Sequence, residues 1–152
     1  MKIKLRSYAP DDFEALFEID QACYPLEVAY SRRELRAYLC FQGADCVIAE
    51  ESGKPVGFCL TAHRDGQGYI VTIDVLESHR GKHVGASLLA ESERRLAANG
   101  VSEIDLETAT DQQSVVAFWL KHGYRKRGLK KGYYPGGRDA FSMVKQLVES
   151  NK

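Results

Sequence analysis

The chain has 152 residues, of which 44% are hydrophobic and 10% aromatic, enough to build the core of one ordinary domain. Lysine and arginine total 21, and so do aspartate and glutamate, so no overall field draws the chain onto nucleic acid or an anionic membrane. The first residues lack the apolar stretch of a signal peptide, and no apolar run reaches the ~20 residues of a membrane-spanning helix. The 4 cysteines are irregularly spaced, which predicts reduced thiols. We therefore expect one cytoplasmic domain over residues 1–152, with no nucleic-acid or membrane partner.

The first elements are a strand and two helices. Residues 3–7 alternate apolar and polar side chains, as a short strand does. Pro10 suits the first turn of a helix, and the apolar residues that follow it have helical spacing until Tyr24-Pro25 breaks the pattern. Ser31 is a suitable N-cap for the second helix.

Three strands and a helix follow. The segments 45–50 and 55–62 flank a Ser-Gly-Lys turn, which predicts a hairpin. The run at 69–75 is rich in β-branched residues on both faces, which is typical of a central strand buried on both sides. After a loop, apolar spacing predicts a helix that ends at Asn99, where Gly100 supplies the left-handed stop.

The last part of the chain alternates strands and a helix. We expect a strand at 102–108, a helix capped by Thr110 or Asp111, and closing strands at about 124–130 and 139–147. This order of elements predicts a mixed α/β sheet.

The most informative motif lies between a buried strand and a helix and reads Arg80-Gly81-Lys82-His83-Val84-Gly85-Ala86. Backbone N–H groups at a helix start have no intrahelical partner, and Gly81 and Gly85 keep side chains away from an approaching anion. The helix dipole, Arg80 and Lys82 add positive potential. The motif is neither GxxxxGK[ST] nor GxGxxG, which disfavours a triphosphatase or a dinucleotide enzyme. It predicts a pyrophosphate site; the alternative is a solvated basic loop.

At these residues the chain resembles the GNAT superfamily of N-acetyltransferases, whose pattern here is Gln/Arg-x-x-Gly-x-Gly/Ala. Arg80, Gly85 and Ala86 match, while His83 replaces the first glycine and, with a helical φ, would still offer its N–H. The resemblance runs from LRSYAPDDFEALFEID through GKPVGF to FWLKHGYRKRG. The closing GYYPGGRDAFSMVK is similar to the subgroup that acetylates protein N-termini, especially bacterial ribosomal-protein alanine N-acetyltransferases. The resemblance implies the GNAT fold, a mixed, mostly antiparallel sheet of about seven strands flanked by about four helices.

The resemblance also implies how acetyl-CoA is held, with no metal ion. Backbone groups of Ile73, Asp74 and Val75 would pair with the pantetheine arm, as an added strand would. The N–H groups of residues 81–86 would hold the pyrophosphate. Gln112 stands where the family has an asparagine that touches the cofactor.

Glu107 matches the position of the family's general base, and Tyr69 would order a water molecule beside it. The alternative for Glu107 is a carboxylate in an edge salt bridge, and for Tyr69 a core aromatic with a bonded hydroxyl. Acetyl transfer needs a neutral amine. An α-amino group, with a pKa of ~7.7–8.0, needs less help than a lysine at ~10.4.

The family's general acid is a tyrosine, and Trp119 takes its place in the cofactor site. An indole N–H donates a hydrogen bond but has no transferable proton near neutral pH. Either the CoA thiolate leaves with hydrogen-bond help alone, or Tyr124, Tyr133 or Tyr134 acts instead. The sequence leaves these alternatives open.

An acceptor peptide would lie between two loops. Tyr133 and Tyr134 would flank its N-terminus, and Tyr24, Pro25 and Leu26 would wall its first side chain; simple loop packing is the alternative for each. We expect an acetyl-CoA-dependent N-acetyltransferase that acts on a protein N-terminus by direct attack in a ternary complex, as a monomer or homodimer. The alternatives are a small-molecule or lysine acceptor and, in another class, a non-catalytic acyl-CoA-binding module.

Overall fold

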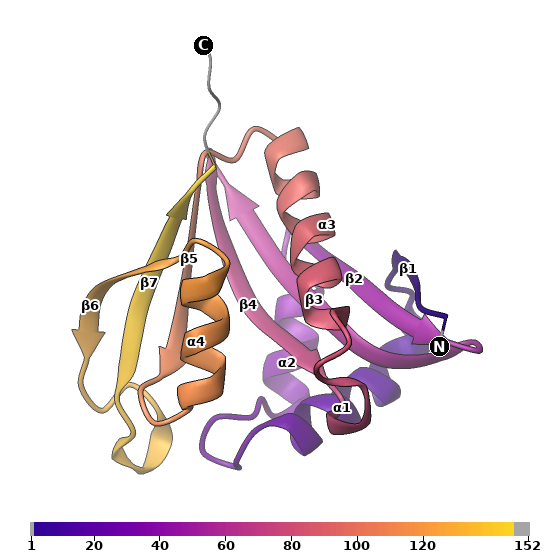
Figure 1. Ribbon diagram of the computed structural model, residues 1–152, viewed down its shortest axis with the longest axis horizontal. Coiled ribbons are helices and arrows are strands. Elements are labelled where there is room, and N and C mark those ends of the chain that lie inside the picture. Colours follow the sequence, from indigo (N-terminus) through magenta and orange to yellow (C-terminus); the bar gives the residue numbers. More distant parts are fainter. Residues whose placement is uncertain (1, 148–152) are drawn as a thin grey trace.

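The computed structural model describes residues 2–147, which form one sheet with helices on both faces (Figure 1). The strands are β1 (Lys4–Ser7), β2 (Ala44–Glu51), β3 (Lys54–Arg64), β4 (Gln67–Val75), β5 (Glu103–Ala109), β6 (Arg125–Lys130) and β7 (Ala140–Gln146). The helices are α1 (Phe13–Cys23), α2 (Arg32–Leu39), α3 (Val84–Ala98) and α4 (Gln113–Lys121), with single 3-10 turns at Pro10–Asp12, Glu77–His79 and Pro135–Gly137. The strand order is β1-β2-β3-β4-β5-β7-β6, and β4 and β5 are the parallel neighbours.

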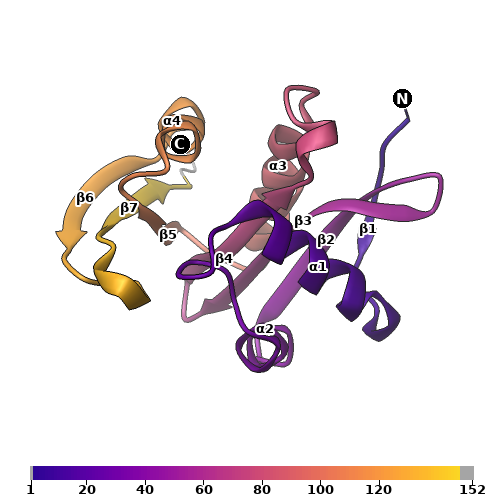
Figure 2. The same cartoon turned by 90° about the horizontal axis from the view of Figure 1, so that it is seen from below.

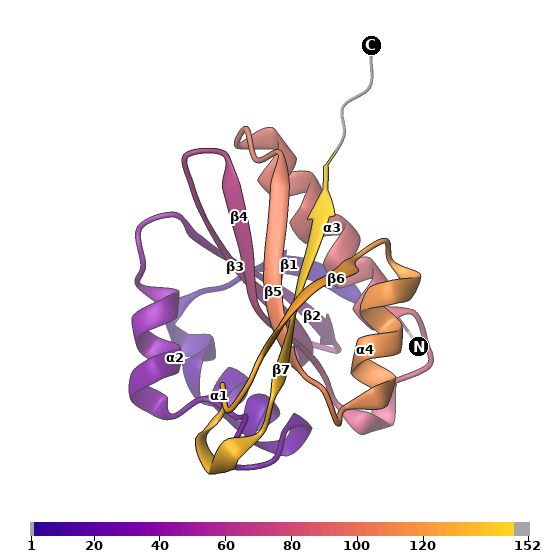
Figure 3. The same ribbon diagram turned by 90° about the vertical axis from the view of Figure 1, so that its left-hand side faces the viewer.

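The helices form two layers, with α1 and α2 on one face of the sheet and α3 and α4 on the other (Figure 3). Leu16 and Leu35 bury the first pair of helices against β2 and β3, and Leu88 and Leu96 bury α3 against the other face. The two cores enclose the sheet, which explains why β3 and β4 carry apolar residues in near-continuous runs. Among residues 2–147, no helix combines the length and apolar character that a bilayer crossing requires.

The predicted cap of α2 is confirmed, while that of α4 is wrong. Ser31 Oγ accepts a hydrogen bond from the Glu34 N–H at 3.1 Å, and the Glu34 carboxylate accepts one from the Ser31 N–H. The helix α4 begins one or two residues later than expected, with Gln112 as its N-cap. The reason is that Thr110 and Asp111 are held elsewhere. The Thr110 N–H donates to a carbonyl at the start of β7, and the Asp111 carboxylate pairs with an arginine of the β6–β7 loop.

A bulge in β4 opens the sheet. Leu60 pairs with Thr72 and Thr61 pairs with Ile70, so Val71 is an extra residue in β4. Such a bulge increases local twist. The strand β4 pairs with β5 only from Gln67 to Tyr69, and the two strands then separate, as Figure 1 shows. The second half of β4 therefore has a free edge.

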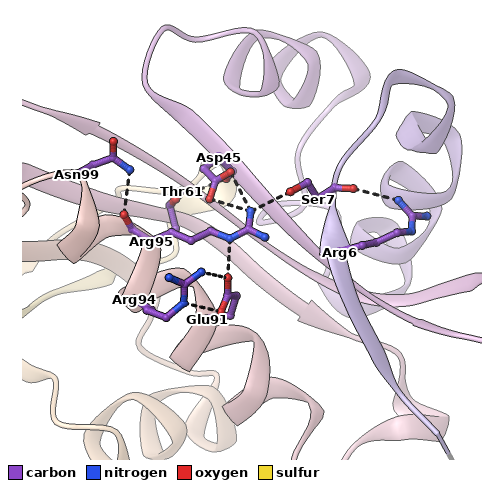
Figure 4. A network of polar contacts seen from close by, with 8 residues as sticks. All are labelled: Arg6, Ser7, Asp45, Thr61, Glu91, Arg94, Arg95 and Asn99. Carbon is purple, nitrogen blue, oxygen red and sulfur yellow. Dashed lines mark hydrogen bonds and ion pairs between the residues drawn. The ribbon is translucent and has the colours of Figure 1, made fainter.

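Polar contacts tie α3 to β1 and β2, at the edge of the sheet away from β5 (Figure 4). The Arg95 guanidinium donates to Glu91 on the same helix at 2.8 Å, to Ser7 Oγ of β1 at 3.1 Å and to Asp45 of β2 at 3.2 Å. This network fixes α3, and with it the helix start that faces the opening between β4 and β5.

Candidate active site

A cleft opens where β4 and β5 separate. Its walls come from β4, β5, α4, the α1–α2 connection (residues 24–31) and the β6–β7 loop (residues 131–139). Figure 2 shows the connection on the side of β4 and the loop on the side of β7. The residues expected from the sequence that line the cleft are Tyr24, Tyr69, Ile73, Glu107, Gln112, Trp119, Tyr133 and Tyr134.

Glu107 is the most heavily hydrogen-bonded group of the cleft. Its Oε1 accepts from the hydroxyl groups of Tyr69 and, at 3.3 Å, of Tyr133, and its Oε2 accepts from Lys130 Nζ at 2.7 Å. The hydrogen bond to Glu107 raises the pKa of Lys130, and burial followed by the bond to Glu107 raises that of Tyr69. The carboxylate is thus held by a cation and two phenols. Sequence reasoning missed Lys130; strand pairing across β7 is what brings it to Glu107.

The three tyrosines that could act as the general acid, Tyr124, Tyr133 and Tyr134, have different surroundings in the structure. Tyr124 is only 2% exposed, and its hydroxyl donates to Glu93 Oε2 at 2.7 Å, outside the cleft lining. Tyr133 is bonded to Glu107. Tyr134 lines the cleft, and its hydroxyl has no acceptor among residues 2–147; burial raises its pKa, so the phenol stays protonated at neutral pH. Tyr134 is the remaining free proton donor of the three.

Trp119 is a core residue with one edge in the cleft. Its ring is 3% exposed and packs edge-on against Phe118 and Tyr124, with centroids 5.2 and 5.1 Å away. This packing holds α4 against the sheet.

The predicted pyrophosphate segment presents free backbone donors. In the described part of the chain, the N–H groups of residues 81–86 have no acceptor, and the first helical bond of α3 runs from the Ser87 N–H to the His83 carbonyl. The expectation that His83 has a helical φ is wrong, because its φ is 66°. A left-handed conformation costs a residue with a Cβ about 1–2 kcal/mol, which gives a physical reason for glycine at this position.

The two glycines of the motif have different surroundings. A Cβ on Gly85 would lie 3.3 Å from the Phe118 ring, so this glycine lets α3 approach α4 closely. A Cβ on Gly81 would meet nothing within 4 Å, but its φ of +74° favours glycine. Gly85 therefore serves helix packing, and Gly81 serves the turn.

Side chains already cover the free edge of β4. The hydroxyl of Tyr24 donates to the Ile73 carbonyl at 2.8 Å, and Arg80 Nε donates to the Val75 carbonyl at 2.8 Å. The Asp74 carbonyl points toward β3, since a Cβ on Gly57 would lie 2.7 Å from it. Of the three residues expected to pair with a pantetheine arm, Ile73 and Val75 thus present carbonyls to the cleft side, while Asp74 does not.

Two residues expected to wall the acceptor pocket lie outside it. Leu26 is 84% exposed. The Pro25 carbonyl accepts hydrogen bonds from the N–H groups of Val28 and Ala29, which forms a tight turn. This turn brings Val28 and Tyr30 into the cleft lining instead. No spacing in the sequence predicts that Val28 and Tyr30 line the cleft in place of Pro25 and Leu26, because this depends on the geometry of the turn.

Comparison with known proteins agrees with this geometry. The family model described as the acetyltransferase (GNAT) family matches residues 13–124. An N-alpha-acetyltransferase of Saccharolobus solfataricus is 33% identical over 94% of this chain and 92% of its own. The crystal structure of the Escherichia coli ribosomal-protein-S18-alanine N-acetyltransferase is 19% identical and has a TM-score of 0.88 over 99% of this chain and 97% of its own. The NatC complex bound to Gag peptide and CoA is 22% identical, with a TM-score of 0.83 over 97% and 100%.

The two solved structures share the fold of this chain, which confirms the expected GNAT fold. The match at residues 13–124 covers well over half of the chain, and the expected N-acetyltransferase class is confirmed with it. The chain, with its free N–H groups at the start of α3 and its cleft between β4 and β5, is thus an enzyme of the acetyltransferase (GNAT) family.

Proposed function

We propose that this acetyltransferase transfers the acetyl group of acetyl-CoA to the N-terminal α-amine of a peptide or protein, by direct attack in a ternary complex. The observation that carries the proposal is Glu107, a carboxylate inside the cleft that is held by Tyr69, Tyr133 and Lys130. A positioned carboxylate attracts an ammonium group and accepts its proton through water. The relative named N-alpha-acetyltransferase supports the same acceptor class.

The residues of the cleft fit acetyl-CoA as a cosubstrate. The unpaired N–H groups of residues 81–86 would bind its pyrophosphate. The Ile73 carbonyl, which accepts from Tyr24, has a second lone pair for an amide of its pantetheine arm. The Val75 carbonyl accepts from both Arg80 Nε and Cys23 Sγ, so it would bind the arm only by giving up one of these donors. Gln112 caps α4 without using its side chain as the cap, so its amide is free to reach the cosubstrate.

The reaction requires two protons to leave an ammonium group, one before and one after the nitrogen attacks, and one proton to reach the sulfur. Glu107 would accept the first proton through a water molecule that Tyr69 orders, and the neutral amine nitrogen would then attack the thioester carbon. The new C–N bond forms as the C–S bond breaks, which leaves CoA as a thiolate, and the nitrogen releases its second proton through water as the amide forms. Tyr134 would donate a hydrogen bond or a proton to that sulfur, since its phenol is protonated and free. Trp119 would contribute packing at the cosubstrate.

The α1–α2 connection and the β6–β7 loop come together beside the cleft. Glu27 of the α1–α2 connection and Arg138 of the β6–β7 loop approach to 3.9 Å, so the two segments meet there. Tyr24, Tyr133 and Tyr134 line the space beneath, where their rings would flank the acceptor N-terminus.

The experiment that tests this proposal compares matched acceptors. CoA release and product mass are measured with a peptide that has a free N-terminus and no lysine, the same peptide with a blocked N-terminus and an internal lysine, and a polyamine. We expect turnover with the free N-terminus alone. Turnover of the lysine peptide or the polyamine would identify the alternative acceptor. Binding of acetyl-CoA without turnover of any amine would identify a binding module.

A further inference from the structure

Two carboxyl groups are buried together beneath the α1–α2 connection. Asp20 of α1 is 0% exposed and Asp74 of β4 is 1% exposed. Each uses one oxygen for a partner: Asp20 Oδ2 accepts from the Tyr30 N–H at 2.8 Å, and Asp74 Oδ1 accepts from Thr72 Oγ1 at 2.5 Å. The other two oxygens, Asp20 Oδ1 and Asp74 Oδ2, are buried and have no hydrogen-bond partner among residues 2–147. The two side chains lie close enough for a hydrogen bond once one of them carries a proton.

Among residues 2–147, no cation makes an ion pair with either carboxyl group of the pair. The groups near it are Cys23 and Tyr24 at the end of α1, Tyr30 of the connection, Glu34 of α2, Cys46 of β2, Thr72 of β4, and Arg80 of the loop after β4. Cys59 of β3 lies on the opposite face of the sheet. Arg80 is the cation of this group, and its Nε is bonded to the Val75 carbonyl. Two buried carboxylates without a bound cation cannot both ionise, so one retains a proton. Burial accordingly raises the pKa of both groups, and that of Asp74 well above its usual value.

The pair is connected to the acceptor side of the cleft. The Tyr30 N–H that Asp20 accepts lies on the α1–α2 connection, whose Tyr24 and Tyr30 hydroxyls donate to the Ile73 and Val71 carbonyls at 2.8 and 3.0 Å. Both tyrosines line the cleft. Hydrogen bonds thus join Asp74 to Thr72 of β4 and Asp20 to the connection that forms one wall of the cleft.

We propose that Asp20 and Asp74 share one proton and act as a positioning element, holding the α1–α2 connection with Tyr24 and Tyr30 against the free edge of β4 and loosening it when that proton is lost. The proton lies on Asp74 Oδ2 and is donated to Asp20 Oδ1, because Asp20 is the carboxylate that a backbone N–H stabilises. Loss of the proton leaves two negative charges facing each other, and the contact that anchors the connection becomes repulsive.

The variant Asp74→Asn tests the shared proton directly. The amide oxygen can still accept from Thr72, and the amide N–H₂ donates to Asp20 at every pH, so the variant reproduces the protonated pair permanently. Asp20→Asn is the second variant, with donor and acceptor exchanged. The matched control is Asp65→Asn in the exposed β3–β4 turn, where φ is 53° and asparagine is well tolerated.

The first readout is urea unfolding between pH 5 and 9, which needs no acceptor. An unfolded aspartate has a pKa of ~3.9, so above that pH the native parent holds a proton that the unfolded chain has released. The parent's folding equilibrium constant should therefore fall, relative to that of Asp74→Asn, by up to about tenfold per pH unit until the pair ionises. Asp65→Asn should follow the parent. Parallel profiles for the parent and Asp74→Asn overturn the proposal. Failure of both amide variants to fold also overturns it, since an amide should replace a protonated carboxyl group.

The second readout locates the effect. The hydrogen-exchange protection factor of the Tyr30 amide should fall at alkaline pH in the parent and stay constant in Asp74→Asn. The kinetic readout rests on the proposed function: KM for the peptide should rise with pH more steeply in the parent than in Asp74→Asn, with acetyl-CoA affinity unchanged in both. If no peptide is a substrate, the proposed function fails, while the unfolding and exchange profiles still decide the shared proton. A Tyr30 amide whose protection is the same in both proteins at all pH values overturns the positioning role.

Discussion

Lys130 reaches Glu107 across the width of β7, with its Nζ 2.7 Å from Oε2. Lys130 lies on the edge strand β6, half-exposed, whereas the Glu107 side chain is only 10% exposed in the cleft. The ion pair therefore places a positive charge beside the carboxylate that we propose as the general base for the acceptor amine. Glu107 can therefore pair either with Lys130 or with the incoming ammonium group of the acceptor. Substitutions of Glu107 and of Lys130 should accordingly have different effects on the reaction.

Glu107→Gln should lower kcat by about 10²- to 10⁴-fold at neutral pH, the usual contribution of a general base. The amide cannot accept the amine proton, so the reaction depends on amine that is already neutral. Raising the pH from 7 to 9 should recover part of the loss, because more of an α-amine with a pKa of ~7.7–8.0 is then neutral. Initial rates at saturating acetyl-CoA measure this. A rate that stays near that of the parent would show that Glu107 only binds.

Lys130→Met removes the cation that competes with the acceptor for Glu107, and it keeps the aliphatic length of the side chain. We expect a lower KM for the peptide and an unchanged affinity for acetyl-CoA. Lys131→Met in the neighbouring loop is the control, since it alters the same surface charge without an ion pair to Glu107. A raised KM in Lys130→Met alone would instead make Lys130 part of the acceptor site.

Tyr134→Phe and Tyr124→Phe remove the same atom from two different settings. Tyr134 presents a protonated, unbonded phenol to the cleft, so its loss should lower kcat with little change in stability. Tyr124 donates to Glu93 in the core, and its loss leaves that carboxylate with Lys145 alone, which should cost about 1–3 kcal/mol of stability and leave kcat intact. Unfolding curves and single-turnover rates distinguish them. A lower kcat in Tyr124→Phe together with a lower stability in Tyr134→Phe would instead make Tyr124 the proton donor and Tyr134 a structural residue.

Local sequence signals predicted the elements but not the contacts between them. The β-branched run of β4, the cap at Ser31 and the glycine after α3 each depend on neighbours in the chain, and the structure matches the prediction at each. The bulge at Val71 depends on the register with β3, which no local pattern specifies.

The same reasoning applies to the site. Glu107 was found by its place in a family motif, but Lys130 depends on pairing across β7, and the meeting of Asp20 with Asp74 depends on how α1 packs on β4. The conformation of His83 could have been anticipated from the glycine that usually stands there, because a glycine position often indicates a positive φ.

Arg6 and Asp12 provide a prediction for acid conditions. The guanidinium donates to both carboxylate oxygens at 2.8 and 2.9 Å, and this hydrogen bonding lowers the pKa of Asp12. A lowered native pKa stabilises the fold above the unfolded value of ~3.9, and the stabilisation is lost as the pH falls through the native value. Asp12→Asn should therefore lose about 1–3 kcal/mol at pH 7 and show a smaller further loss below pH 4 than the parent. Urea unfolding at pH 7 and pH 3 measures both; an equal loss at both pH values would contradict the ion pair.

His83→Gly should stabilise the enzyme, because His83 holds a φ of 66° at the start of α3 and the side chain is exposed. Glycine adopts this conformation without the ~1–2 kcal/mol cost of a Cβ, although its greater freedom in the unfolded chain offsets part of the gain. We expect a net gain of about 0.5–1 kcal/mol, read as a higher Tm. His83→Asn is the control: asparagine tolerates a positive φ better than most residues, so its Tm should lie between those of the parent and the glycine variant. The backbone N–H remains in all three proteins, so acetyl-CoA should still raise Tm in each. A lower Tm for His83→Gly would mean that the imidazole makes a stabilising contact that outweighs the backbone cost.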